Sequence, residues 1–219
     1  MKTILMVGAT GMIGGLILEE ALKSDEVAQV ISISRRSSKI SHTKLKEVIH
    51  DQFLDYLAIK HLFSNIDSAF FCIGVYTGSV TQEELKKVTI DYVFAFADML
   101  KECSPNATCG FLSGMGADRS EKSEISFARY KGIAENYLLS KNFKELYIFR
   151  PGYIYPVTPR TEPNVSYTLY RFFYPLLNIF VPSVSVTSEH LAKAMFYVGM
   201  KGYDKDTLEN KDILKIHLD

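Results

Sequence analysis

The sequence contains little cysteine: three of its 219 residues are Cys72, Cys103 and Cys109, and no two of them form a Cys-x-x-Cys pair. An odd and widely spaced set argues against a disulfide framework and against a zinc site, so we expect no metal. Cys72 and Cys109 lie in apolar runs and are expected to be small buried hydrophobic residues.

Net charge is also lacking, because 25 basic residues balance 25 acidic ones. With no overall field and no basic stripe beyond Arg35 and Arg36, neither nucleic acid nor an anionic membrane is expected as a partner. No apolar run reaches the roughly 18 residues of a membrane-spanning helix. The first apolar run is broken at 8–11, and Glu19 and Glu20 follow, so we expect no signal peptide. These absences predict a cytoplasmic protein.

The length fits one large α/β domain. The composition is that of a globular protein, with 47% hydrophobic residues. No internal repeat, linker or low-complexity segment divides the chain. We therefore predict a single domain over residues 1–219.

The most informative stretch is KTILMVGATGMIG at 2–14, where an apolar run meets Gly8, Gly11 and Gly14 and continues into a helical pattern. A buried strand, a tight turn and a helix start present backbone N–H groups and the positive end of a helix dipole to an anion. Gly8 permits the turn, Gly11 lets a pyrophosphate approach, and Gly14 lets the helix lie close to the strand. The alternative is a turn whose glycines serve packing alone. The context favours dinucleotide binding.

The rest of the chain alternates strand and helix patterns. Apolar or β-branched runs predict strands at 28–34, 45–49, 68–73, 108–113 and 145–150, with a last strand at 213–218. Helices are expected at 52–63, from Thr81 to before Pro105, at 125–141 and from Ser188. This alternation predicts an α/β fold, a three-layer Rossmann domain with a doubly wound parallel sheet in the order 3-2-1-4-5-6, with a small C-terminal region on the substrate side.

The second predicted strand ends in Arg35-Arg36-Ser37-Ser38, and no acidic residue lies between Val30 and Ile40. In this fold an acid at that place holds the 2′-hydroxyl of NAD, whereas arginine accommodates the 2′-phosphate of NADP. Paired guanidinium groups offer charge-assisted hydrogen bonds to a phosphate. A solvated basic loop is the alternative. We expect NADP(H), with NAD less favoured.

Two more strand ends bear on the same site. Asp51 follows the third strand, where such folds often place an acid against the adenine amino group, but it equally fits the N-cap of the helix at 52–63. Cys72, Ile73 and Gly74 end the fourth strand and would pass the ribose and pyrophosphate.

Residues 153–187 have a different character, with five prolines and eight aromatic residues. Three interpretations remain open: a cover over the substrate cleft, a dimer surface, or ordinary core. The first two make the segment an insertion that covers the cleft or forms a homodimer.

Together these features resemble the short-chain dehydrogenase/reductase superfamily, in particular its atypical members that are similar to nucleoside-diphosphate-sugar epimerases. The resemblance is carried by GATGMIG at 8–14, SRRSS at 34–38, Ser113, Lys131-Gly132, RPGYI at 150–154 and VTSEHLAKAM at 186–195. It implies that the segment after Pro151 lies along the nicotinamide amide. The residues expected to contact the cofactor are Gly8, Thr10, Gly11, Met12, Ile13, Gly14, Arg35, Arg36, Asp51, Cys72, Ile73, Gly74, Lys131, Pro151, Gly152, Tyr153 and Ile154.

Enzymes of this superfamily use a serine after strand five and a tyrosine four residues before a lysine. The lysine lowers the pKa of the tyrosine, which transfers a proton while the serine polarises the substrate oxygen. Ser113 and Lys131 match, but the residue four before Lys131 is Phe127, which cannot transfer a proton. Tyr130 is a candidate donor only if that turn is distorted, because it points about 100° away round a regular helix. Tyr76 and Tyr153, at strand ends, are other candidate donors.

Two functions from different classes follow. The first is an NADP(H)-dependent oxidoreductase or epimerase-like enzyme that acts on a small carbonyl or hydroxyl substrate. The second is a non-catalytic NADP(H)-sensing protein that regulates a protein partner. Ser113 and Lys131 favour the first, and Phe127 favours the second, because a missing general acid lowers a rate by about 10²- to 10⁴-fold.

Overall fold

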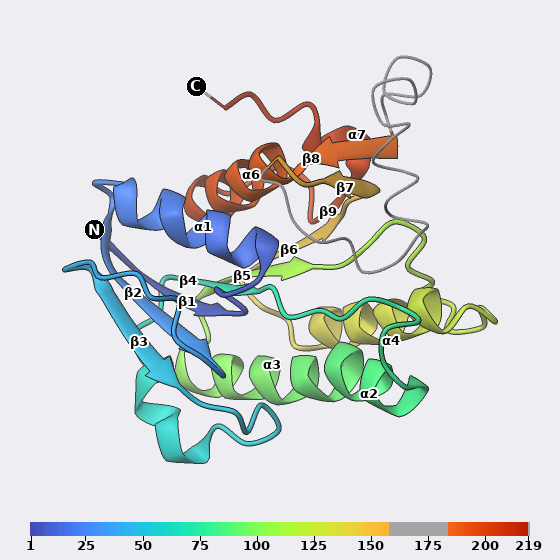
Figure 1. The fold of residues 1–219 in the computed structure, drawn as a ribbon, viewed down its shortest axis with the longest axis horizontal. Helices are drawn as coiled ribbons and strands as arrows, with labels where there is room; N and C mark the ends of the chain where they lie inside the picture. Colours follow the sequence, from blue (N-terminus) through green and yellow to red (C-terminus); the bar gives the residue numbers. More distant parts are fainter. Residues whose placement is uncertain (158–183, 219) are drawn as a thin grey trace.

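The computed structural model describes residues 1–157 and 184–218, and within these it contains a seven-stranded sheet with helices on both faces (Figure 1). The order is β3-β2-β1-β4-β5-β6-β9, and each neighbouring pair is parallel. The strands are β1 (Lys2–Val7), β2 (Val27–Ser34), β3 (Leu45–Ile49), β4 (Ser68–Phe71), β5 (Thr108–Leu112), β6 (Glu145–Arg150) and β9 (Thr207–Glu209). The predicted doubly wound order is confirmed.

The central strand β1 shows why the sheet is buried on both faces. Ile4, Leu5, Met6 and Val7 have no exposed surface. Ile4 and Met6 join the core on one face, and Leu5 and Val7 join the core on the other. Side chains alternate along a strand, so an unbroken apolar run gives two cores at once.

Helices cover the two faces in separate layers (Figure 1). One core contains residues of α1 (Met12–Lys23) and α6 (Ser188–Lys201). The other contains residues of the 3₁₀ helix η1 (Leu57–Phe63), α3 (Tyr92–Cys103) and α4 (Ser126–Ser140). α3 is preceded by α2 (Gln82–Lys86) and the π-helical turn η2 (Lys87–Asp91). The predicted start at Thr81 is confirmed, because its side chain accepts a hydrogen bond from the N–H of Glu84.

The prediction of a last strand at 213–218 is wrong. The seventh strand of the sheet is β9, and α7 (Asn210–Ile213) follows it directly. A capping box between Glu209 and Asp212 starts this helical turn. Ile213 and Ile216 are buried three residues apart, which is helical rather than strand-like spacing.

The predicted helix at 52–63 is also shorter than expected. Only Leu57–Phe63 is helical, with Tyr56 at its N-cap position, so Asp51 caps no helix. Residues 52–55 form a turn instead, in which the N–H of Asp55 donates to the carbonyl of Gln52. The turn buries the rings of Phe53 and Tyr56 in the core below it.

Most of the segment at 153–187 lies outside the described residues, and its interpretation as an insertion stays a prediction. Its two ends are described: β7 (Tyr153–Tyr155) pairs in parallel with β8 (Ser185–Thr187). Among residues 1–157 and 184–218, no helix combines the length and the apolar character needed to cross a membrane.

The loop after β5 is held tightly against α4. The N–H of Asp118 donates to the carbonyl of Ala128, and the Asn136 side chain donates to the carbonyl of Arg119. A Cβ added to Gly132 would lie 1.7 Å from the carbonyl oxygen of Asp118. This close approach fixes the backbone at Asp118 and Arg119, and with it the point from which the Arg119 side chain extends.

We predict that Gly132→Ala destabilises the protein by about 1–3 kcal/mol, because the added methyl group overpacks the contact with the backbone of Asp118. Helix propensity alone predicts the opposite sign, a gain of about 1 kcal/mol. Urea unfolding of the variant gives the free energy of unfolding. Gly74→Ala is the control, since a Cβ there meets nothing within 4 Å. Equal or higher stability of Gly132→Ala would contradict the described packing.

Candidate functional site

The carboxyl ends of the parallel strands β1, β4 and β5 meet at one edge of the sheet, and the glycine turn lies there. Gly8 has a φ of 94°, a conformation that favours glycine. A Cβ on Gly8 would lie 2.7 Å from the carbonyl carbon of Cys72, and one on Gly14 would lie 2.2 Å from the carbonyl oxygen of Gly8. The chain therefore needs glycine at both positions to bring α1 against β1.

The first turn of α1 has no side-chain cap. Gly11 is its N-cap residue, no side chain accepts a hydrogen bond there, and no acidic residue lies in the first turn. The N–H of Gly11 closes the turn by donating to the carbonyl of Gly8 at 2.9 Å. A helix start without a capping side chain or an acid presents its positive end to an anion. Thr10, Met12 and Ile13 belong to this same turn.

Arg35 and Arg36 lie just beyond the end of β2, the strand next to β1, and both are exposed. Among the described residues neither guanidinium group has an ion-pair partner. The hydroxyl of Ser34 donates to the carbonyl of Arg36 at 2.8 Å and so shapes the turn. Asp51 is exposed after β3, where its carboxylate accepts a hydrogen bond from the Gln52 amide.

The other predicted cofactor residues follow β4 and β6. Cys72 is buried, which raises the pKa of its thiol to about 12, while Ile73 is half-buried and Gly74 exposed. After β6, the carbonyl of Pro151 accepts a hydrogen bond from the N–H of Met115. The N–H of Gly152 donates to the side chain of the buried Asn210 at 2.8 Å. Tyr153 and Ile154 are half-buried in β7.

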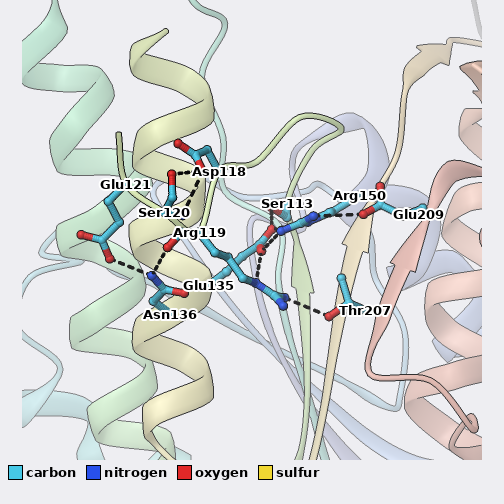
Figure 2. A network of polar contacts seen from close by, with 10 residues as sticks. All are labelled: Ser113, Asp118, Arg119, Ser120, Glu121, Glu135, Asn136, Arg150, Thr207 and Glu209. Carbon is cyan, nitrogen blue, oxygen red and sulfur yellow. Dashed lines mark hydrogen bonds and ion pairs between the residues drawn. The ribbon is translucent and has the colours of Figure 1, made fainter. Parts of the chain in front are cut away.

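Ser113 directly follows β5, and its hydroxyl donates to the carboxylate of Glu135 at 2.5 Å (Figure 2). Glu135 lies on α4 and has no exposed surface. Its carboxylate also accepts hydrogen bonds from Arg119 Nε at 2.8 Å, from Arg150 Nε at 2.9 Å and from Arg150 Nη2. We call these four residues the Glu135 cluster.

The Glu135 cluster reaches the edge strand β9. Arg150 Nη1 donates to Glu209 at 3.0 Å, and Arg119 Nη2 donates to the hydroxyl of Thr207 at 2.9 Å (Figure 2). Two carboxylates thus balance two guanidinium groups, which is how buried charges are tolerated. The hydrogen bonds with Glu135 raise the pKa of Arg150 above its usual value.

Lys131 lies one helical turn before Glu135 and is 7% exposed. Its Nζ donates to the carbonyl of Leu112 at 2.8 Å and lies 4.7 Å from the centre of the Phe111 ring. Burial lowers the pKa of Lys131 to about 8, against the opposing charge of Glu135 and the nearby Cys72 thiol. The ammonium group is therefore easily neutralised.

Phe127 lies one turn before Lys131, and its ring packs against Gly114: a Cβ on Gly114 would lie 2.6 Å from the ring. Phe127 thus lies beside the backbone that follows Ser113. α4 is α-helical throughout Ser126–Ser140, so Tyr130 is not turned onto the face of Phe127 and Lys131. The guanidinium of Arg129 lies 5.3 Å from the Tyr130 ring centre. Tyr76 lies in the loop after β4.

Glu135 and Arg119 were not predicted from the sequence, and Arg150 was considered only as part of a motif. Ser113 and Lys131 were predicted, but not the partners that hold them. One signal was present: Glu135 follows Lys131 by four residues on the helix face that buries Ala128, Gly132 and Leu138. A carboxylate on a buried face requires cationic partners.

Comparison with known proteins supports this picture. Residues 4–108 match the NAD dependent epimerase/dehydratase family. Protein HTATIP2 of Rattus norvegicus is 26% identical over 224 residues, covering 100% of this chain and 90% of that protein. Protein fmp52-1, mitochondrial, of Aspergillus terreus is 24% identical over 230 residues, covering 99% of each.

Solved structures show the same fold. The Bordetella bronchiseptica enzyme WbmH in complex with NAD⁺ has a TM-score of 0.70 at 18% identity, covering 95% of this chain and 74% of that one. Yeast methylglyoxal/isovaleraldehyde reductase Gre2, complexed with NADPH, has a TM-score of 0.69 at 16% identity, covering 94% and 77%. The predicted resemblance is borne out by the family match over residues 4–108, and these structures bear out the fold.

The prediction of a cytoplasmic location is wrong by this comparison, since relatives from several fungi are named mitochondrial. The prediction rested on absences, namely no signal peptide, no apolar span and no net charge. Each of these absences is compatible with a mitochondrial protein as well as with a cytoplasmic one.

We predict that replacing the buried ammonium, in Lys131→Met, removes a pH dependence of stability. Because the folded pKa of about 8 lies below the unfolded value near 10.4, unfolded chains bind more protons between these values. The contribution of Lys131 to the free energy of unfolding therefore rises with pH there, by about 2 kcal/mol from about pH 7.5 to about pH 9.5, and the variant lacks this rise. Urea unfolding of both proteins at the two pH values measures this, and equal pH dependence would contradict the assignment.

Proposed function

We propose that this protein is an NADP(H)-dependent oxidoreductase or epimerase-like enzyme that acts on a small carbonyl or hydroxyl substrate. The observation that carries the proposal is the uncapped start of α1 behind the Gly8 turn, with exposed Arg35 and Arg36 at the end of the next strand. The start of α1 suits the diphosphate of a dinucleotide, and the two arginines at the end of the neighbouring strand suit a ribose phosphate.

The choice of NADP(H) follows from charge. An acid at the end of β2 would repel a 2′-phosphate, whereas the two guanidinium groups there have no ion-pair partner among the described residues. The turn after Ser34 keeps both close to β2. The structures of WbmH with NAD⁺ and Gre2 with NADPH support a nicotinamide cofactor in general, and the arginines support the phosphorylated form.

The remaining residues fit the other half of such a cofactor. Lys131 would bind the nicotinamide ribose, and the backbone at 151–154 would lie along the nicotinamide amide. The cofactor would supply hydride transfer. The chain's own contribution is to orient the reactants and to exclude water, which the buried Ser113 and Lys131 favour.

A second candidate is a non-catalytic NADP(H)-sensing protein that regulates a protein partner. The observation in its favour is the Phe127 ring packed on Gly114, because this ring occupies the helix position of the usual proton donor. A sensor needs a surface whose partner affinity differs between the free and the cofactor-bound protein.

We predict that Arg35→Asp/Arg36→Ser shifts the coenzyme preference toward NAD(H). The variant loses charge-assisted bonds to the ribose phosphate and gains a carboxylate that can accept from a ribose hydroxyl. Calorimetric titration with NADPH and with NADH measures both affinities, and we expect their ratio to change by at least about tenfold.

The matched control for this titration is Lys144→Asp, which reverses an exposed charge just before β6. Lys144 lies at the amino ends of the strands, opposite the carboxyl ends where the glycine turn lies. It should leave the ratio unchanged. Unaltered selectivity in the arginine variant would refute the ribose-phosphate assignment, and no heat with any pyridine nucleotide would refute both candidate functions.

We further predict that Phe127→Tyr raises turnover by about 10²- to 10⁴-fold, since it restores a proton donor four residues before Lys131. Absorbance of NADPH measures rates in both directions, with aldehydes and ketones plus NADPH and with alcohols plus NADP⁺. Phe127→Leu controls for repacking beside Gly114, and Lys131→Ala gives the background. If wild type and Phe127→Tyr both stay at the Lys131→Ala rate while NADPH binds, the sensor is favoured over the enzyme.

A further inference from the structure

The hydroxyl proton of Ser113 is already used inside the protein. Ser113 Oγ donates to Glu135 at 2.5 Å, and the same carboxylate forms ion pairs with the guanidinium groups of Arg119 and Arg150. An ionised carboxylate only accepts hydrogen bonds, so the proton in this contact comes from the serine. The orientation of the Ser113 hydroxyl is therefore fixed by chemistry.

The surroundings of Glu135 make this orientation hard to change. One carboxylate oxygen accepts from Ser113 and Arg150 Nε, and the other accepts from Arg119 Nε and Arg150 Nη2. The side chain has no exposed surface, so no bulk water replaces a lost donor. A hydrogen bond to a charged group is about twice as strong as one between neutral groups. Turning the hydroxyl toward a neutral carbonyl would exchange the stronger bond for the weaker one.

Among the residues that the structure describes, no side chain donates to the Ser113 hydroxyl, so its capacity to accept is unused there. A hydroxyl oxygen has one proton and two lone pairs. The neighbouring side chain on α4, Phe127, offers neither a donor nor an acceptor. The Lys131 ammonium is held by the Leu112 carbonyl and the Phe111 ring. The Ser113 hydroxyl, at the end of β5, therefore acts toward a ligand as a hydrogen-bond acceptor.

We propose that the site is selective for a ligand that donates a hydrogen bond to Ser113, namely a hydroxyl compound in preference to the carbonyl compound with the same carbon skeleton. The proposal rests on the proposed function and deepens it, because it names the alcohol as the form that binds beside the oxidised cofactor. Glu135 is a positioning residue in this arrangement, since it acts through Ser113.

The test measures binding of matched alcohol and ketone pairs to the full chain saturated with NADP⁺: 2-butanol with 2-butanone, cyclohexanol with cyclohexanone, and 1-phenylethanol with acetophenone. Saturation-transfer NMR titrations give the affinities. We expect alcohols of the panel to bind about tenfold more tightly than their ketones. Equal affinities, tighter ketones or no bound alcohol would overturn the inference. Failure of NADP⁺ itself to bind would instead overturn the proposed function.

Variants separate this role from a structural one. Ser113→Ala should bring the alcohol-to-ketone ratio to about one while NADP⁺ affinity is retained, and Ser113→Thr, which keeps a hydroxyl, should restore the preference. Ser140→Ala is the control, because that hydroxyl donates only to the Tyr137 carbonyl near the end of α4. An unchanged ratio in Ser113→Ala would overturn the inference. If Ser113→Ala fails to fold, the wild-type ratio and the threonine variant decide.

Discussion

The buried carboxylate of Glu135 is the contact on which the site depends most. It joins α4 to the end of β5 through Ser113, to β6 through Arg150, and to the loop after β5 through Arg119. The two arginines then continue to β9. Removing one partner of such a cluster leaves an uncompensated buried charge, which is destabilising by about 3–5 kcal/mol. The carboxyl edge of the sheet is therefore held by charge as well as by packing.

The same edge has two distinct electrostatic environments. Around β1 and β2 the positive groups are the backbone N–H groups of α1 and two exposed guanidinium groups, and within residues 1–157 and 184–218 no acidic side chain pairs with them. Around β5 and β6 the charges are paired with one another, about the fully buried Glu135. The first environment suits an anionic ligand brought from solution, and the second suits a fixed constellation of reacting groups, because paired buried charges do not reorganise easily.

The features that were predictable from the sequence are those with local causes. The strand, glycine turn and helix at 2–23 need only neighbours in the chain, and the strand order follows from handedness and from the same turn. The strand expected at 213–218 was wrong because the capping box of Glu209 and Asp212 starts a helical turn that apolar content alone does not reveal. The cluster around Glu135 was missed because its partners lie far away in sequence. A single sequence shows that a buried acid needs cations, but not which ones.

Helix α4 combines three different side chains on one face at intervals of four residues: Phe127, Lys131 and Glu135. In the enzymes that this sequence resembles, a tyrosine at the first of these positions transfers a proton, and the lysine lowers the pKa of that tyrosine. Here the Phe127 ring against Gly114 has no proton to transfer, the Lys131 ammonium has a pKa lowered to about 8, and the Glu135 carboxylate accepts the hydrogen bond of Ser113. The difference from the pattern is therefore larger than one substitution. The Phe127 ring and the hydrogen bond from Ser113 to Glu135 act in the same direction, since neither side chain offers a donor to a carbonyl oxygen, and together they leave an acceptor at the end of β5.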